Sequence, residues 1–470
     1  MKGMTPLHGT THWLYASFIA ALAVSIVSCS TPPSHPDPSV RDPGVRGGPA
    51  GAGGPLPGLT ADETEFFNSG FATFAEVEGV PDGLGPRFNA NQCSACHLQP
   101  AVGGTSPAKN PMPDIAVLNG AKNSIPWFIA SDGPIREARF KANPDGSPDG
   151  GVHALFVISG RSDAQGCTLA QPDFLPAGDP HSGLGGNPNV VFRIPTPVFG
   201  DGLIEAIPDA EILANMHSNR TQKSDWGIKG RPNALISGTA NLSGNDGTIT
   251  RFGWKAQNKS LVMFSGEAYN VEMGVTNTVF PQERDTSQAC ALNATPEDVV
   301  HFSAKENTEV ITDVEAFAIF MRLLAPPAPA PDSPSTVRGL DLFKTTGCAA
   351  CHTPSMRTGR MVASGSSTSP SAALSNQTVN LFSDLLLHQM GEGLADGITQ
   401  GGAGPDEFRT APLWGVGKRI FFLHDGRTRD LVQAIEAHRS NGSEANKIVE
   451  RFNKLSAADQ QAIIDFLRSL

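Results

Sequence analysis

The sequence has few charged side chains, few aromatic ones and no excess of basic residues. Only 17% of its 470 residues are charged and 7% are aromatic, and the formal net charge is −11 at pH 7. Nucleic-acid phosphates need a basic surface, so this balance excludes nucleic acid as the main partner. Because 39% of the residues are hydrophobic, disorder along the whole chain is excluded as well.

Glycine and proline, in contrast, are abundant, with 50 and 38 residues. This composition indicates many loops and excludes a compact all-helical bundle. The length allows roughly two to four domains. Together with the helices and strands predicted below, this gives an expected fold class that is mainly α, with long loops and a few short strands.

The first residues are typical of an export signal. Lys2 is the only charged residue before Asp37, and residues 13–27 are nearly all apolar or small. A membrane-spanning helix needs roughly 20 apolar residues, so this shorter run fits the core of a signal peptide. It ends in Ile-Val-Ser-Cys at Cys29, which resembles a bacterial lipobox. We predict a lipoprotein signal peptide at 1–28 and a lipid anchor at Cys29; the alternative is an ordinary secretory signal with an incidental cysteine.

The next segment predicts a flexible connection to the membrane. Residues 29–59 are rich in proline and glycine and are expected to form a tether that cannot pack a core. Ser30, directly after the cysteine, resembles the pattern that sorts lipoproteins to the outer membrane. The expected location is the bacterial cell envelope, at the outer membrane and facing the periplasm.

Two copies of one short motif indicate the cofactor. The sequences CSACH and CAACH both have C-x-x-C-H spacing, the attachment signature of c-type haem. Two thiols at this spacing add to the two vinyl groups of one porphyrin, and the adjacent histidine reaches the iron. We predict two covalently attached haem c groups, held by Cys93, Cys96, Cys348 and Cys351, with His97 and His352 as iron ligands.

Other uses of these cysteines fit less well. A zinc site would combine the two pairs, but they lie 252 residues apart and each carries a histidine that zinc does not need. A thioredoxin-like pair needs a βαβ setting that the sequence lacks. Cys167 and Cys290 are left over. In an oxidising compartment we favour a disulfide between them, with two free buried thiols as the alternative.

Caps and hydrophobic spacing predict several helices. Thr60 and Glu63 are spaced as a capping box. One long helix is expected over 296–324, with Pro296 near its start, because apolar residues from Val310 to Met321 repeat at helical spacing. Further helices are expected at 208–216, 337–344 and from Ser456 to the C-terminus, and short strands at 154–158 and 190–194.

These elements predict two cytochrome c-like haem domains. The first covers residues 60–324 and contains a large insertion. A Pro-rich linker follows at 325–335, and the second domain covers 336–470.

Longer segments around the motifs resemble a known family. These segments are GLGPRFNANQCSACH, FRIPTPVFGDGLIEAIPD, RFGWKAQNKSL and FRTAPLWGVGKRIFFLHDGRTRDLVQAIEAH. Over residues 60–470 they resemble the di-haem oxidoreductase family of proposed peroxidases, also called thiol oxidoreductases. More distantly the chain is similar to bacterial di-haem cytochrome c peroxidases and to the di-haem enzymes that mature methylamine dehydrogenase. The resemblance implies two facing haem domains, one haem accepting electrons and the other activating peroxide. It also suggests Ca2+ as a further cofactor.

The resemblance implies a second iron ligand for the C-terminal haem. At the position of His438, the similar di-haem peroxidases usually have Met as this ligand, and the maturation enzymes have Tyr. Leu431, Ile435 and His438 have the spacing of one helical face, which agrees with an inward histidine. The alternative is a buried histidine that does not bind iron. His424 is expected to be a structural hydrogen-bonding residue.

The resemblance also implies catalytic residues between the haems. Trp254 matches an aromatic residue on the electron path, and Glu267 takes the place of a Gln near the peroxide-activating haem. Glu272 matches the acid–base Glu, although the segment before it is shorter than in the family. Peroxide must lose a proton to bind iron, and its leaving oxygen must gain one. Surface charge for the two carboxylates, core packing for Trp254 and iron ligation by Met273 remain alternatives.

The second ligand of the N-terminal haem is open. Peroxidases have a distal histidine shortly after the motif, but here the next one is His153. The iron is either five-coordinate or bound by a distant histidine, for which the candidates are His153, His181, His217 and His301. Arginines in the family-like segments are weak candidates for pairing with haem propionates, namely Arg193, Arg251 and Arg409.

We therefore expect a haem oxidoreductase of peroxidase type, in which the C-terminal haem relays electrons to the N-terminal haem. The alternatives are a lipid-tethered electron-transfer cytochrome, and an oxidase of thiols or protein side chains. The expected partners are a periplasmic small cytochrome or cupredoxin, peroxide or another small substrate, and the membrane through Cys29.

Overall fold

The protein is described here by a computed structural model. The structure describes residues 35–118, 125–158, 164–172, 174, 189–234, 249–284, 287–303, 308–365 and 369–470. The expected signal peptide, Cys29 and His181 lie outside these residues.

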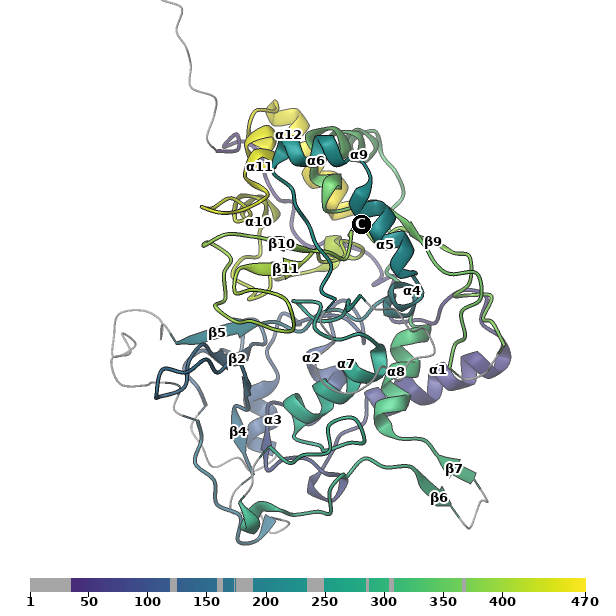
Figure 1. Cartoon of the computed structure of the whole chain (residues 1–470), viewed down its shortest axis with the longest axis vertical. Helices are drawn as coiled ribbons and strands as arrows, with labels where there is room; N and C mark the ends of the chain where they lie inside the picture. Colours follow the sequence, from purple (N-terminus) through teal and green to yellow (C-terminus); the bar gives the residue numbers. More distant parts are fainter. Residues whose placement is uncertain are drawn as a thin grey trace, which may run out of the picture. The chain divides into compact units, whose positions relative to one another are not determined.

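Helices are the main regular elements of the described chain (Figure 1). They are α1 (Ala61–Phe74), α2 (Cys93–Cys96), α3 (Met112–Leu118), α4 (Asp201–Glu205), α5 (Asp209–His217), α6 (Arg220–Trp226), α7 (Leu261–Ala268), α8 (Asp313–Leu323), α9 (Pro334–Thr346), α10 (Leu431–Glu436), α11 (Asn446–Asn453) and α12 (Ala457–Ser469). The predicted helices at 208–216 and 337–344 are confirmed as α5 and α9. The predicted caps at Thr60 and Ser456 begin α1 and α12.

The strands are short and antiparallel. They are β1 (Arg87–Phe88), β2 (Glu137–Phe140), β3 (Val152–His153), β4 (Phe156–Val157), β5 (Val190–Arg193), β6 (His301–Ser303), β7 (Thr308–Val310), β8 (Met356–Arg357), β9 (Thr378–Val379), β10 (Leu387–Gln389) and β11 (Glu407–Arg409). The order β3-β2-β5 makes one sheet, and β1-β4, β6-β7, β8-β9 and β10-β11 are pairs. The fold is thus mainly helical with a few short strands, as the sequence predicts.

Two helix pairs accompany the two C-x-x-C-H motifs. Helix α1, before the first motif, packs on α8, and α9, before the second motif, packs on α12. Each crossing is close because it contains a glycine. A Cβ on Gly70 would overlap the Ala316 carbonyl, and one on Gly339 would overlap the Ala462 carbonyl. The chain therefore repeats one local plan, helix, motif and closing helix.

The prediction of one helix over 296–324 is wrong in its first half. Helix α8 begins only at Asp313, and β6 and β7 form a hairpin before it. Thr312 and Glu315 form a capping box that starts the helix. The β-branched residues in the preceding stretch favour strands over a helix.

The prediction of a tether that cannot pack is wrong for residues 35–59. Val40 is buried in the core formed by α9, α10 and α12. Asp42 forms a buried ion pair with Arg468 of α12, with oxygen–nitrogen distances of 2.7 Å. Further along, the amide of Leu56 donates to the Leu323 carbonyl at the end of α8. This segment therefore packs against both halves of residues 34–470, which form one compact unit.

A disulfide links two distant parts of the insertion. Cys167 and Cys290 are bonded, and their Cα atoms lie 4.6 Å apart. Both are buried in the larger core. The favoured alternative from the sequence is confirmed.

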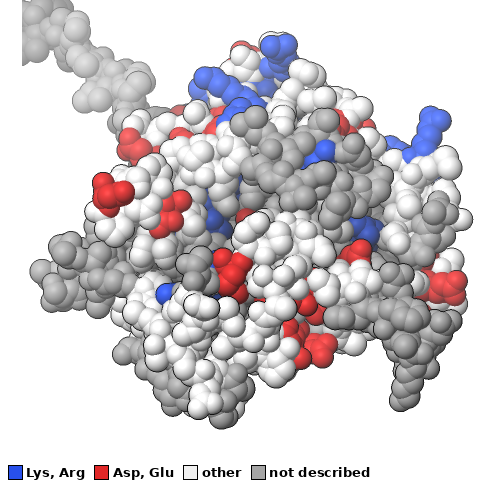
Figure 2. All heavy atoms as spheres, turned by 60° about the horizontal axis from the view of Figure 1, so that its bottom comes forward, with Lys and Arg blue, Asp and Glu red and all other residues white. Residues whose placement is uncertain are grey.

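Residues 325–335 carry no regular secondary structure up to the start of α9, but the two halves do not separate there. Apolar residues from the second half, among them Leu374 and Leu386, belong to the same core as α1 and α8. On the face drawn in Figure 2, described acidic and basic side chains are interspersed. Within the described part of the chain, no helix combines the length and apolar character needed to span a membrane.

Candidate functional site

The two C-x-x-C-H motifs adopt similar turns. Residues 93–96 form α2 and residues 348–350 a single 3-10 turn. In each, the amide of the histidine donates to the carbonyl of the first cysteine, at 3.0 Å for His97 and 2.9 Å for His352. None of the four cysteines is in a disulfide, and all are partly buried. Burial raises the pKa of each of these thiols.

Both motif histidines are oriented in the same way. Nδ1 of His97 lies 3.0 Å from the Gly104 carbonyl oxygen, and Nδ1 of His352 lies 3.0 Å from that of Phe382. A carbonyl only accepts, so Nδ1 carries the proton and Nε2 keeps its lone pair. This is the usual way to orient a metal-binding histidine. Burial lowers the pKa of both imidazoles to about 4, which keeps them neutral.

The second motif opens on a cavity of about 230 Å³ with a mostly apolar lining. Cys348, Cys351 and His352 line it, and so does His438. His438 lies two residues beyond α10, not on the helix itself as the spacing predicts. Its Nδ1 donates to the Ala434 carbonyl at 2.7 Å, so its Nε2 is also unprotonated. Burial and then the neighbouring His438 lower the pKa of His352, which indicates that the two imidazoles are close.

Two arginines line the same cavity, Arg419 buried and Arg409 partly buried. Arg419 is 7% exposed, and its Nε and Nη2 atoms have no hydrogen-bond partner. Arg409 donates from Nε to the Gly253 carbonyl at 3.0 Å. Burial lowers the pKa of both guanidinium groups to about 10, still far above neutral pH. A carboxylate in this cavity would satisfy the unpaired nitrogens of Arg419.

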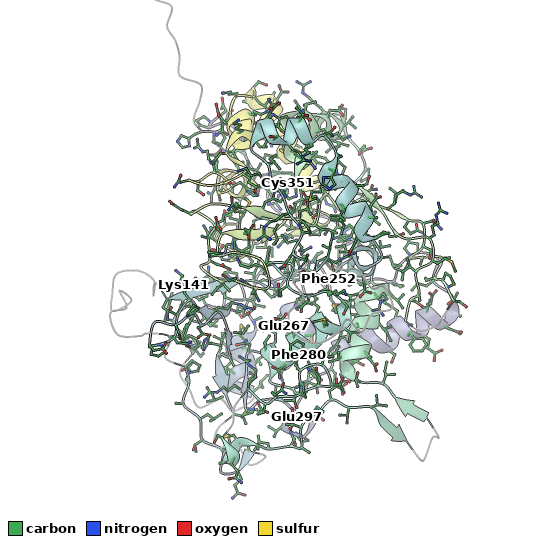
Figure 3. All side chains as sticks on the ribbon, in the orientation of Figure 1. Lys141, Phe252, Glu267, Phe280, Glu297 and Cys351 are labelled. Atoms are coloured by element: carbon green, nitrogen blue, oxygen red, sulfur yellow. A yellow bond between two sulfur atoms is a disulfide. The ribbon has the colours of Figure 1, made fainter. Side chains whose placement is uncertain are left out.

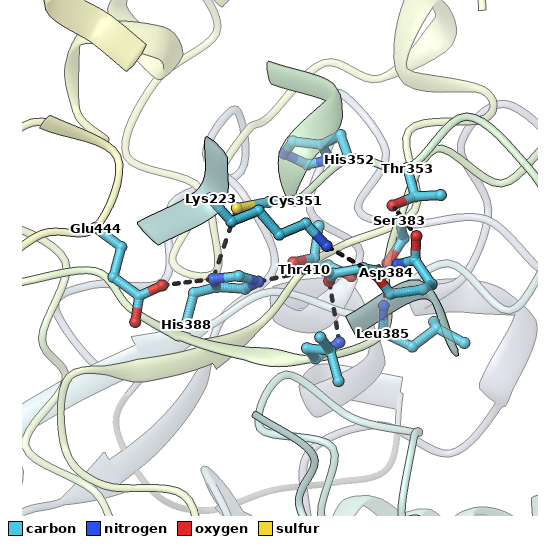
Figure 4. Close-up of polar contacts among 12 residues, drawn as sticks. Lys223, Cys351, His352, Thr353, Ser383, Asp384, Leu385, His388, Thr410 and Glu444 are labelled. Carbon is cyan, nitrogen blue, oxygen red and sulfur yellow. Dashed lines mark hydrogen bonds and ion pairs between the residues drawn. The ribbon is translucent and has the colours of Figure 1, made fainter. Parts of the chain in front are cut away.

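A buried histidine, His388, contacts a cysteine of the second motif (Figure 4). Nδ1 of His388 lies 3.6 Å from Sγ of Cys351 and 2.7 Å from Glu444, and its Nε2 lies 2.9 Å from Asp384. Among the described residues, Cys351, Asp384 and His388 form the one group of His, Cys and acidic side chains close enough to share a metal ion. Ca2+ prefers oxygen ligands throughout, so this group does not suit it, and calcium stays a prediction.

The first motif opens on a smaller cavity of about 100 Å³. Cys93, Cys96 and His97 line it, and Glu272 lies in its wall. Glu272 belongs to a π-helical turn, Tyr269–Met273, that continues α7. Burial, and then the nearby Glu137, raises the pKa of Glu272 to about 8. The Asn89 side chain donates to it at 3.4 Å.

No histidine other than His97 lines this first cavity among the described residues. His153 instead lies 2.7 Å from Asp149 and stacks on Phe140. His217 is exposed at the end of α5. The side chain of His301 is outside the described part. Sδ of Met273 lies 3.9 Å from Sγ of Cys93, next to a motif cysteine.

The structure does not bring Glu267 to either cavity lining. Its carboxylate accepts hydrogen bonds from Gln257, at 3.3 Å, and from Asn258. In Figure 3 it lies well away from Cys351. The catalytic role that the resemblance implies for Glu267 is not supported by this position.

Trp254 lies at the boundary between the cavities. It lines the second cavity and donates from Nε1 to the Ile194 carbonyl at 2.9 Å. Pro195, the next residue, lines the first cavity. The amide of Ile194 donates to the carbonyl of His424, which lines the second cavity. The segment at Ile194 and Pro195 therefore connects the walls of the two cavities.

The other arginines named from the sequence are occupied elsewhere. Arg193 forms a buried ion pair with Asp396 at 2.7 Å, and Arg251 pairs with Asp209. Neither lines a cavity.

Sequence reasoning missed several cavity residues, namely Arg136, Tyr269, His388 and Arg419. Arg419 lies in a segment that resembles the family, so it could have been named from the sequence as a candidate propionate partner. For the others, only the fold reveals the position.

These residues fit haem. In each cavity the two cysteines and the histidine of one motif face the same space, and the histidine presents its Nε2. In the larger cavity the unpaired Arg419 nitrogens suit a propionate.

No curated protein matches the chain. Among solved structures, the chain is similar to a hydrazine synthase of Kuenenia stuttgartiensis pressurised with xenon (18% identity, 35% of this chain, 57% of that chain, TM-score 0.22). It is also similar to the diheme peroxidase BthA from Burkholderia thailandensis (16%, 47%, 65%, TM-score 0.28). A third is a MauG-like protein associated with microbial copper homeostasis (15%, 65%, 95%, TM-score 0.28). The match thus spans less than two thirds of each of the first two chains.

A protein-family profile gives the clearest assignment. The profile described as "Di-haem oxidoreductase, putative peroxidase" matches residues 186–470. The match includes the second motif and begins after the first, so it is shorter than the resemblance over 60–470. It covers more than half of the sequence, and haem is the cofactor that this family implies. The chain belongs to the di-haem oxidoreductase family.

Proposed function

We propose that the protein is a di-haem c-type oxidoreductase of peroxidase type, with peroxide reduced at the first motif and electrons received at the second. One observation carries this proposal, the difference between the two cavities. The second is lined by a second histidine with a free Nε2, His438. Among the described residues, His97 is the one histidine that lines the first cavity, and the ionisable Glu272 lies in the same lining.

Haem, when bound, supplies the redox chemistry in both cavities. We propose thioether attachment through the cysteines of each motif. His97 and His352 would bind iron through Nε2, each held by a backbone carbonyl. His438 would complete the ligands of the second haem. Arg419 would pair with a propionate there.

Glu272 is the acid–base group of the proposal. Its carboxyl group takes a proton from the first peroxide oxygen and returns one to the leaving oxygen. With a pKa of about 8, it can hold or release a proton near neutral pH, which suits both steps. Nearby arginines compensate its charge when it is ionised, since Arg139 and Arg284 both lower its pKa.

Trp254 is the proposed link for electrons. Its indole contacts the second cavity and hydrogen-bonds to Ile194, whose neighbour Pro195 lines the first. Trp254 is only 9% exposed, so the proposed path is shielded from solvent at this residue.

The partners and location follow from the sequence. We propose a lipoprotein of the bacterial outer membrane, anchored at Cys29 and facing the periplasm. A small periplasmic cytochrome or cupredoxin would donate electrons, and peroxide would be the small substrate.

An electron-transfer cytochrome is the second candidate, and His438 favours it in part, because a haem with two histidine ligands suits electron transfer. It would need a strong second ligand at the first haem as well. Among the described residues lining that cavity, three methionines offer a soft ligand atom, namely Met112, Met273 and Met321. The sulfur of Met273 lies 3.9 Å from Sγ of Cys93.

The test is electron paramagnetic resonance of the holoprotein in the oxidised and half-reduced states. We expect one high-spin ferric haem, at rest or after half-reduction, and one low-spin haem. His438→Ala should convert the low-spin haem to high spin. The double variant C93S/C96S should remove the original high-spin signal. Two low-spin haems in both states would exclude peroxide reduction and favour the electron-transfer role.

A further inference from the structure

Tyrosine is rare in this chain, and one of the few tyrosines, Tyr269, is buried beside the first cavity. The sequence has two tyrosines, and the other is Tyr15, within the predicted signal peptide. Tyr269 is 2% exposed and lines the first cavity. It begins the π-helical turn that carries Glu272. The proposed acid–base mechanism makes no use of it.

The phenol group of Tyr269 has a proton acceptor in contact. Its hydroxyl donates to Oδ2 of Asp313 at 3.0 Å. Asp313 is the first residue of α8, where the helix dipole favours a negative carboxylate. A second buried carboxyl group, Glu78, also hydrogen-bonds with the tyrosine, and burial is the main reason that its pKa is raised to about 8.

Aromatic rings connect Tyr269 to the predicted iron ligand of the first motif. The rings of Tyr269 and Phe317 meet edge to face at 5.0 Å, Phe317 meets Phe74 at 6.1 Å, and Phe74 meets His97 at 6.0 Å. Tyr269 therefore reaches the first motif in two ways: it lines the same cavity, and it is linked to His97 through the rings of Phe317 and Phe74.

We propose that Tyr269 is a redox-active residue that gives one electron to the peroxide-reducing centre of the first cavity and its phenolic proton to Asp313. This inference rests on the proposed function, which supplies peroxide as the oxidant. Reduction of one peroxide to two waters takes two electrons and two protons. Tyr269 would supply one electron, the second haem, reduced beforehand by the donor protein, would supply the other, and solvent water would supply the two protons.

At the tyrosine, one electron and one proton leave together. The O–H bond of Tyr269 breaks, its proton goes to Oδ2 of Asp313, and a neutral tyrosyl radical remains. An electron from the donor then reduces the radical, and Asp313 returns the proton. An oxidising equivalent is thereby held at a buried side chain until an electron arrives from the donor protein.

The experiment uses the full-chain protein with both haems attached. It is first reduced by one electron, then mixed with one equivalent of hydrogen peroxide, frozen within milliseconds and examined by electron paramagnetic resonance. We expect an organic radical whose hyperfine structure narrows when the protein carries ring-deuterated tyrosine. The signal should be lost in Tyr269→Phe. Because Tyr15 would be removed with the predicted signal peptide, the label in the mature protein reports Tyr269. Asp313→Asn should lower the radical yield several-fold, because an amide does not take up the proton.

Haem content and absorption spectra of each variant report whether it has folded. Uniform labelling with 3-fluorotyrosine avoids substitution altogether, and the radical should then show fluorine splitting. A radical that persists in Tyr269→Phe or ignores both labels overturns the inference. Peroxide consumption by the wild type without any tyrosyl radical overturns it alone. If the wild type does not reduce peroxide, the proposed function fails and this inference fails with it.

Discussion

Replacement of Glu272 by Gln is the most direct test of the chemistry proposed for the first cavity. The amide keeps the size of the side chain and its contact with Asn89, but it cannot take up the peroxide proton. A positioned acid–base group contributes about 10²- to 10⁴-fold to a rate. We therefore expect the peroxidase rate of E272Q to fall by that factor, which corresponds to roughly 3–5 kcal/mol in the barrier.

The pH profile gives the sign of the effect. Only the ionised carboxylate acts as a base, and burial raises its pKa to about 8. About one molecule in ten is ionised at pH 7, so the rate at limiting peroxide should rise nearly tenfold per pH unit below pH 7, about fivefold from pH 7 to pH 8, and then level off. This rising limb should be missing in E272Q.

The same shift changes stability in the opposite direction. Because the folded-state pKa is raised, the folded protein binds the proton more tightly than the unfolded chain. The stability from this proton is complete below the unfolded pKa and is lost as the pH rises through about 8. E272Q should thus have a higher melting temperature than the wild type at pH 9, with a smaller difference at pH 7.

Glu267→Gln is the matched control. Glu267 lies five residues earlier on α7, outside the first cavity, and bonds to Asn258 and Gln257. We expect it to keep the wild-type pH profile and most of the activity. Steady-state peroxide reduction from pH 5 to 9 measures both variants. If E272Q keeps the rising limb, or loses no more activity than E267Q, the acid–base assignment is refuted.

Three further outcomes follow from the described contacts. His438→Met should raise the reduction potential of one haem, by on the order of 100 mV within the roughly 0.8 V that axial ligands span, measured by potentiometric titration; an unchanged potential contradicts ligation. Replacing Cys167 and Cys290 by Ser opens a loop with a sequence separation of 123 and should cost about 5 kcal/mol in denaturant unfolding; a loss below about 1 kcal/mol contradicts the entropic argument. Asp42→Ala leaves a buried arginine unpaired and should cost about 3–5 kcal/mol, while the exposed Asp37→Ala should cost under about 0.5 kcal/mol; equal losses would show that the segment does not dock.

Local signals in the sequence predicted which helices are present better than they predicted where each helix begins and ends. The capping box at Thr60 and Glu63 predicts the start of α1 correctly, because both partners lie within one turn. The helical spacing from Val310 to Met321 is real, but most of it belongs to α8. A second capping box at Thr312 was present in the sequence and marks the true start. Periodicity alone extended the helix into a hairpin.

Composition was misleading for residues 35–59. A segment rich in proline and glycine has few apolar side chains, so nothing within it predicts packing. Val40 and Leu56 are nevertheless buried, and Asp42 finds its partner more than 400 residues later in α12. Contacts of that range are decided by the fold of the rest of the chain and leave no local trace.

For the site, the motifs predicted which residues face each cavity but not what lies opposite. Cys93, Cys96 and His97 occupy one turn, so their spacing in the sequence is enough to predict that they lie close together. Glu272 and His438 reached the list of candidates only through the family resemblance. Arg419 was passed over for three other arginines, because sequence does not show which guanidinium groups already have partners.

The two motifs are nearly identical in local geometry, so the difference in function that we propose must come from elsewhere. Both histidines make the same Nδ1 bond to a carbonyl at 3.0 Å. The difference lies in the segment brought in from later in the chain. The turn after α7 brings a carboxyl group to the first cavity, and the turn after α10 brings an imidazole to the second. A carboxyl group suits proton transfer, and an imidazole suits a closed iron. In the proposed function it is therefore these two turns, and not the C-x-x-C-H motifs, that would assign reduction of peroxide to one haem and electron transfer to the other.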